Sequence, residues 1–133
     1  MDNKDLKAFI SAQQGELNAV LMYQEFAKVT KNPELKAHFQ EAARDEAKHA
    51  ANLAKYTGET LKPGKAQAKL LGFLYRILPK RLIFWGISIG EYSGGNNYKK
   101  YIGDTYPEME SMMYDEYRHG DKAKEFSKAK IKK

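Results

Sequence analysis

The chain has 133 residues and contains no cysteine, only four prolines and few β-branched residues. The absence of cysteine excludes, within these residues, disulfides, thiolate metal sites, thiol nucleophiles and the four-cysteine iron centre of rubredoxins. The scarcity of proline and the abundance of Ala, Leu, Lys and Glu favour helix. No basic segment followed by an apolar run opens the chain, so no signal peptide is predicted and a cytoplasmic protein is expected.

No motif for binding DNA or RNA accompanies the net charge of +6, so nucleic acid is not an expected partner. Much of the charge lies in residues 121–133, which carry six lysines against Asp121 and Glu125. We interpret this tail as a solvated helix end. The alternative is a docking patch for an acidic partner or a membrane surface.

The spacing of apolar residues predicts four long helices in a single domain, residues 1–133. Asn32 and Pro33 suit the start of a helix, Gly58 suits a helix end, and Thr105 with Glu108 resembles a capping box. The expected helices cover residues 5–30, 33–56, 80–103 and 106–128, and a crossover over 58–79 contains a short helix. Two antiparallel hairpins joined by one long crossover form an all-α, ferritin-like four-helix bundle.

The segment KLLGFLYRILPKRLIFWGISIG is long and apolar enough to resemble a membrane span. Charged residues and Pro79 in its middle would be costly in hydrocarbon. We therefore expect a core-facing helix followed by a surface helix that packs on the bundle or on a partner subunit. Apolar residues 70–89 indicate a homodimer, and a shallow membrane contact is the alternative.

Two sequence patterns recur along the chain. GELNAVLMYQEF (15–26) matches GEYSGGNNYKKY (90–101) at an offset of 75, and DEAKHAANLAKY (45–56) matches DEYRHGDKAKEF (115–126) at an offset of 70. Both helices of the first hairpin therefore recur, in order, in the second. The repeat predicts a duplicated helix hairpin with pseudo-twofold symmetry.

Each expected hairpin places one Glu opposite one Glu-x-x-His at a similar depth. Four inward carboxylates and two imidazoles in a dry core would be prohibitive unless two divalent cations compensated them. This is the ligand pattern of dinuclear carboxylate bundles, and it suits two iron ions, two manganese ions or a mixture. We predict Glu16 and Glu91 as terminal ligands, Glu46 and Glu116 as bridges, and His49 and His119 as imidazole ligands. The alternative is a plain bundle whose Glu and His are exposed.

Four further residues are candidates for supporting such a site. Asp45 and Asp115 precede the motif glutamates and could accept hydrogen bonds from His119 and His49 respectively, or could face solvent. Tyr23 and Tyr98 lie two turns from Glu16 and Glu91. They could hydrogen-bond a ligand, relay an electron, or pack in the core.

At AQQGELNAVLMYQEFA, FQEAARDEAKHAANLAKYTG, GEYSGGNNYKKY and DEYRHGD the sequence resembles the rubrerythrin family, over about residues 5–126. The resemblance implies a di-iron oxidoreductase that reduces hydrogen peroxide or O2, with a role in oxidative stress. It places the family's ligands on the six residues predicted above. Because the chain lacks a rubredoxin domain, it also implies a separate electron donor such as rubredoxin or ferredoxin.

The chain departs from the family at Gly94, where relatives commonly carry a second glutamate one turn after the first. Six ligands remain, which is closer to ferritin-like oxygenases. A ferroxidase or iron-handling protein, an oxygenase acting on a hydrophobic, quinone-like substrate, and a protein with structural metals are therefore alternatives. Gly94 and Gly95 open a channel for a small oxidant or allow close helix approach.

Overall fold

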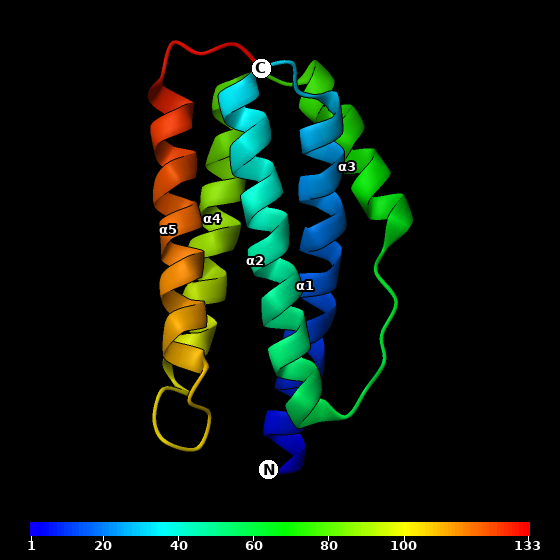
Figure 1. Cartoon of the computed structure of the whole chain (residues 1–133), viewed down its shortest axis with the longest axis vertical. Helices are drawn as coiled ribbons and strands as arrows, with labels where there is room; N and C mark the ends of the chain where they lie inside the picture. Colours follow the sequence, from blue (N-terminus) through cyan, green and yellow to red (C-terminus); the bar gives the residue numbers. More distant parts are fainter. The chain divides into compact units, whose positions relative to one another are not determined.

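The computed structural model describes residues 1–133 and consists of five α-helices with their connections (Figure 1). They are α1 (Asn3–Val29), α2 (Pro33–Thr57), α3 (Lys65–Ile77), α4 (Lys80–Lys99) and α5 (Met109–Lys128). The chain divides into two compact units, Met1–Arg76, with the α1–α2 hairpin, and Ile77–Lys133, with the α4–α5 hairpin. The predicted all-α class is confirmed, and the order of hairpin, short helix and hairpin is consistent with a ferritin-like bundle.

The α1–α2 hairpin is bounded by local capping interactions. Asp2 Oδ1 accepts from the Asp5 N–H at 2.7 Å, so α1 begins two residues earlier than predicted. Asn32 Oδ1 accepts from the N–H groups of Glu34 and Leu35 at 3.0 and 3.1 Å, and Pro33 follows as the first helical residue. Gly58 ends α2 at φ 67°, a left-handed conformation that glycine adopts without strain.

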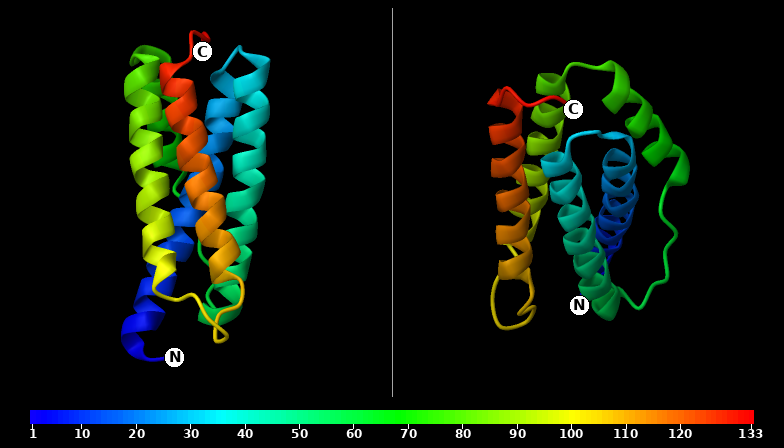
Figure 2. Two further views of the ribbon diagram at one scale, coloured as in Figure 1. Left: turned by 90° about the vertical axis from the view of Figure 1, so that its left-hand side faces the viewer. Right: turned by 45° about the horizontal axis from the view of Figure 1, so that its top comes forward.

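An aromatic cluster joins α3 to this hairpin. The Tyr75 ring stacks on Phe26 at 4.9 Å between ring centroids and meets Phe39 edge-on at 5.7 Å. Tyr75 is 1% exposed, and burial raises the pKa of its hydroxyl. Figures 1 and 2 show α3 running beside α1. The aromatic contacts therefore set which side of α3 faces the hairpin.

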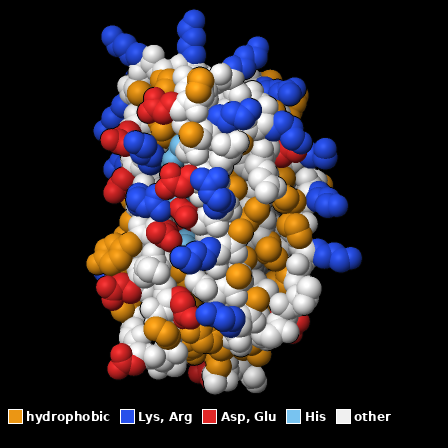
Figure 3. Space-filling model, viewed as in Figure 1, with side chains coloured by type: hydrophobic (Ala, Val, Ile, Leu, Met, Phe, Trp, Pro, Cys, Tyr) orange, Lys and Arg blue, Asp and Glu red, His pale blue; other side chains and the backbone are white.

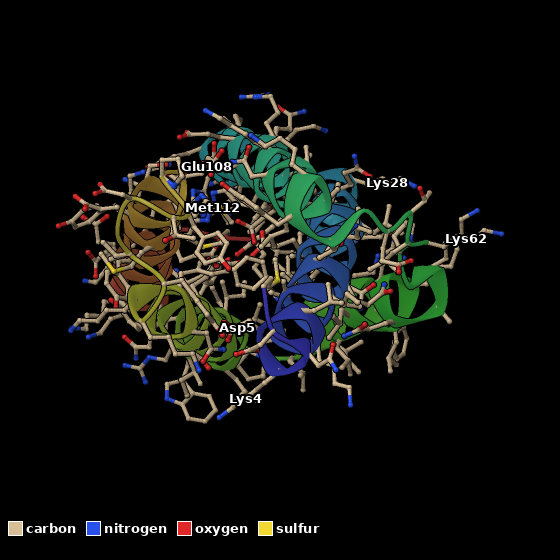
Figure 4. The ribbon with its side chains drawn as sticks, turned by 90° about the horizontal axis from the view of Figure 1, so that it is seen from below. Lys4, Asp5, Lys28, Lys62, Glu108 and Met112 are labelled. Carbon is tan, nitrogen blue, oxygen red and sulfur yellow. The ribbon has the colours of Figure 1, made fainter.

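Side chains of α1 also fix the loop that leads to α3. Gln13 Nε2 donates to the Glu59 carbonyl at 3.0 Å, and Gln14 Nε2 donates to the Lys62 carbonyl at 2.8 Å. Asn18 Oδ1 accepts from the Gly64 N–H at 2.7 Å. In the view along the helices, Lys62 projects outward at the edge of the molecule, near α3 (Figure 4). The long crossover is thus held along α1 by side-chain amides.

The turn between α4 and α5 differs from its prediction. α4 ends at Lys99, not at residue 103, and α5 begins at Met109, not at residue 106. The capping box predicted at Thr105 is wrong, because Glu108 is the N-cap residue and its side chain makes no capping hydrogen bond. The physical reason is Pro107, which disfavours helical backbone at Tyr106, the first helical residue that a cap at Thr105 would need.

The apolar segment that resembled a membrane span is divided between α3 and α4, with the break at Leu78 and Pro79. None of the five helices combines the length and the apolar character that crossing a membrane requires.

Within the second unit, Phe84 of α4 packs on Phe126 of α5 with ring centroids 5.5 Å apart, and both are buried.

Replacing the Asn32 cap tests the turn of the first hairpin. Asn32→Ala removes the acceptor for two backbone N–H groups, and we expect a loss of about 1 kcal/mol in the free energy of unfolding. Asn32→Asp keeps an acceptor there and should lie within a few tenths of a kcal/mol of the parent. Urea unfolding followed by circular dichroism measures both. Equal midpoints for Asn32→Ala and the parent would contradict the assigned cap.

Candidate metal centre

The α1–α2 hairpin buries one cluster of possible metal ligands. Glu16 comes from α1, and Glu46 and His49 lie one turn apart on α2. His49 Nδ1 lies 3.2 Å from Glu16 Oε2 and 3.5 Å from Glu46 Oε1. Their relative exposures are 6, 2 and 1% in chain order, so all three are removed from bulk solvent. The predicted opposition of one Glu to one Glu-x-x-His is present in this unit.

The α4–α5 hairpin buries the matching cluster. Glu91 comes from α4, and Glu116 and His119 come from α5. His119 Nδ1 lies 3.4 Å from Glu91 Oε2, and the three residues are 6, 3 and 1% exposed in chain order. The second unit therefore repeats the arrangement of the first, although α5 begins later than its prediction.

The donor chemistry of each cluster fits a divalent metal. In each, two carboxylates and one imidazole offer ligand atoms within 4.8 Å of one another. Desolvated carboxylates are costly unless a cation compensates them. Nδ1 is the imidazole nitrogen that faces the carboxylates, so it is the candidate donor atom of both histidines. Oxygen and imidazole ligands without thiolate suit iron or manganese, and two buried clusters of this kind are consistent with a dinuclear site.

The other four predicted site residues have mixed surroundings. Asp45 and Asp115 are half-buried, and Asp115 pairs with Arg118 of its own helix at 3.4 Å. Their predicted hydrogen bonds to His119 and His49 stay predictions. Tyr23 is fully buried and stacks on Phe39 with centroids 6.0 Å apart, so it takes part in the aromatic core. Tyr98 is 4% exposed on α4.

Gly94 makes room for a predicted ligand. A Cβ atom at this position would lie 2.9 Å from Glu116 Oε2, a distance that such contacts essentially never show. The Glu116 carboxylate therefore uses the space that a side chain at 94 would need. Of the two readings of Gly94, close packing against the next helix is the one that this geometry supports.

Two tyrosines beside the second cluster were missed by the sequence reasoning. A Cβ atom at Gly95 would lie 2.4 Å from the Tyr117 ring, and one at Gly120 would lie 2.9 Å from the Tyr92 ring. Each ring thus covers a glycine of the facing helix. The signal was in the repeat, because the positions matching Gly120 and Tyr92 in the first hairpin are Ala50 and Leu17.

The hydroxyl groups of both tyrosines donate hydrogen bonds to polar side chains on the exposed side of this hairpin. The Tyr117 hydroxyl donates to Asn96 Oδ1 at 2.6 Å. The Tyr92 hydroxyl donates to Asp121, and this hydrogen bond raises the pKa of Tyr92 to about 12. Because the folded protein holds the Tyr92 proton more tightly, the bond stabilises the fold below pH 10.0 and its contribution is lost as the pH rises toward about 12.

An alkaline titration tests this hydrogen bond. Asp121→Asn removes the charged acceptor, so the pKa of Tyr92 should fall from about 12 toward the ordinary 10.0. Tyrosinate absorbance would show one tyrosine titrating at lower pH than in the parent. Glu125→Gln removes an exposed charge from the same helix and is the control. Superimposable curves for Asp121→Asn and the parent would refute the bond.

Comparison with known proteins gives one family. The rubrerythrin family model matches residues 8–74, which is 67 of the 133 residues and includes the whole first cluster. It stops before the second cluster, which is therefore assigned from its own geometry. Neither the curated proteins nor the solved structures gave a match. The match spans half of the chain, and the chain belongs to the rubrerythrin family.

Proposed function

We propose that the chain is a di-iron oxidoreductase that reduces hydrogen peroxide or O2 with electrons from a separate donor protein. The observation that carries this proposal is the pair of buried clusters, each with two carboxylates and one imidazole whose Nδ1 lies within 3.5 Å of a carboxylate oxygen. Membership of the rubrerythrin family supports the same chemistry.

In this proposal the two clusters serve one centre. Four carboxylates carry four negative charges, which two divalent ions would balance. Glu16 and Glu91 would hold one metal each, Glu46 and Glu116 would be the shared ligands predicted from the sequence, and His49 and His119 would each offer one Nδ1. Bound iron would supply the electrons and the Lewis acidity for cleaving an O–O bond. The chain's own part is to hold the ligands in place and to exclude bulk water from them.

The electrons must come from outside the 133 residues. Reduction of hydrogen peroxide to two waters consumes two electrons and two protons, and the chain has no cysteine with which to hold a rubredoxin iron. A separate rubredoxin or ferredoxin is the proposed donor. The chain's net charge of +6 would favour the approach of such an acidic protein.

One observation favours a second candidate, an oxygenase acting on a hydrophobic, quinone-like substrate. Gly94 stands where rubrerythrins commonly carry an additional glutamate, and the Glu116 carboxylate takes the space beside it. The ligand set then stays at four glutamates and two histidines, as in ferritin-like oxygenases. O2, not peroxide, would be the oxidant in that case.

Anaerobic loading with Fe(II), followed by mixing with peroxide or O2, tests the proposal. We expect about two iron ions per chain, fast oxidation seen in the absorbance spectrum, retention of the iron, and re-reduction by rubredoxin. Released or mineralised iron would instead support a ferroxidase. A faster reaction with O2 than with peroxide would support the oxygenase.

Two variants of α2 sharpen this experiment. Glu46→Gln removes a proposed bridge and should lower both the iron bound and the oxidation rate by at least tenfold. Glu41→Gln changes an exposed carboxylate of the same helix and should keep both. If Glu46→Gln binds and oxidises iron like the parent, the proposed centre is wrong.

Gly94 offers a separate test of the same cluster. Gly94→Ala places a methyl group against Glu116 Oε2, so we expect metal affinity to fall by about tenfold or more. Gly86→Ala is the matched control, because a Cβ there meets nothing within 4 Å. It should leave affinity unchanged and raise stability by about 0.5–1 kcal/mol. Chelator competition and thermal unfolding measure the two quantities. Equal affinities for both variants would contradict the role given to Gly94.

A further inference from the structure

The stretch that holds α3 and α4 carries a net charge equal to that of the whole chain. The positive charge of the tail, residues 121–133, is offset by the acidic residues of 101–120. Residues 65–100 carry seven Lys and Arg and a single acidic residue, Glu91, which gives +6. Residues 1–64 carry nine basic and nine acidic residues, and residues 101–133 carry seven of each, so both are neutral. Glu91 is buried. The exposed charges of α3 and α4 are therefore all positive.

The same two helices carry most of the exposed large apolar side chains. Six of the nine such side chains in the chain lie on α3 and α4, at relative exposures of 48 to 60%. They are Leu70, Phe73 and Ile77 on α3, and Leu82, Trp85 and Ile89 on α4. On each helix the spacing is three and then four residues, which places the three side chains on one side of the helix.

We call the three exposed apolar side chains on each helix its stripe. Neither stripe can be buried by a small rotation of its helix. The opposite side of α3 is already packed, since Tyr75 stacks on Phe26 and Gly72 admits the Glu25 side chain, which would lie 3.3 Å from a Cβ there. The opposite side of α4 carries buried Phe84 and Glu91. Figure 3 shows Lys and Arg side chains projecting along the right-hand edge, where α3 and the loop before it lie.

We propose that the exposed sides of α3 and α4 dock on an anionic phospholipid surface. A helix that lies in a membrane interface presents apolar and aromatic side chains to the acyl boundary and Lys or Arg to the headgroups. Trp85 is the aromatic type enriched at that boundary, and Lys69, Arg76 and Arg81 are exposed beside the stripes. Each helix therefore presents an apolar stripe with basic side chains beside it.

Two other occupants fit the observations less well. A second copy of the chain would present the same residues in a twofold dimer, so it would bring two net charges of +6 together without an exposed carboxylate between them. This argues against the homodimer expected through residues 70–89. An acidic protein would match the charge, but it gives no reason for apolar stripes with interfacial spacing on two successive helices.

The single tryptophan of the chain makes the proposal directly measurable. Because Trp85 is 60% exposed and has no other tryptophan to mask it, its emission reports on this face alone. Vesicles containing phosphatidylglycerol should shift the emission to shorter wavelength and protect it from acrylamide, whereas phosphatidylcholine vesicles should not. Lipids brominated near the headgroup should quench it. No shift with anionic vesicles would overturn the proposal.

Matched variants test the basic and the apolar side chains of this surface separately. Lys69→Glu should weaken vesicle binding by about tenfold, and Lys48→Glu, an exposed change on the neutral α2, should not. Leu70→Ser should also weaken it, whereas Tyr114→Ser, at a residue 59% exposed on α5, should leave it unchanged. Equal effects of test and control variants would overturn the proposal. So would a blue shift that grows with protein concentration alone, or one that needs acidic rubredoxin and not lipid.

Discussion

Four carboxylates and two imidazoles are buried in this chain, and the cost of keeping them from water constrains everything around them. Each hairpin meets the constraint in the same way, with one glutamate from its first helix and a Glu-x-x-His turn from its second. The helices must be long and antiparallel for these residues to meet. Without a cation, the desolvated carboxylates destabilise each hairpin, and a bound cation would remove this cost. Metal binding and folding should therefore be coupled.

The two hairpins satisfy that constraint with different packing. In the first, aromatic rings of α1, α2 and α3 fill the core, and Tyr75 fastens the crossover helix to it. In the second, tyrosine rings cover glycines of the facing helix, and their hydroxyls are held by Asn96 and Asp121. The ligand positions are thus repeated while the surrounding volumes are exchanged between small and large residues. A repeat can keep its ligands while its packing changes, because metal binding requires particular residue types, whereas packing requires only that neighbouring side-chain volumes complement each other.

Much of this was predictable because it rests on local signals. The cap at Asn32, the stop at Gly58 and the three-residue spacing of Glu46 and His49 act within one or two turns, and the structure has them as expected. The capping pattern at Thr105 gave the wrong start for α5, since Pro107 disfavours the helical backbone that Tyr106 would need after that cap. The tyrosine–glycine contacts depend on the register between α4 and α5. The sequence also did not show which side of α3 is buried, because this helix carries apolar residues on two sides.

The contact between Glu116 and Gly94 has an evolutionary consequence. A side chain at position 94 would enter the space that Glu116 Oε2 already uses, so the Glu116 carboxylate would have to move. The two positions are therefore epistatic, because the effect of a substitution at 94 depends on where that carboxylate can go. A descendant of this chain that gained the glutamate common in its relatives would also have to keep a displaced Glu116 able to bind metal. Selection for metal binding would therefore act on positions 94 and 116 as a pair.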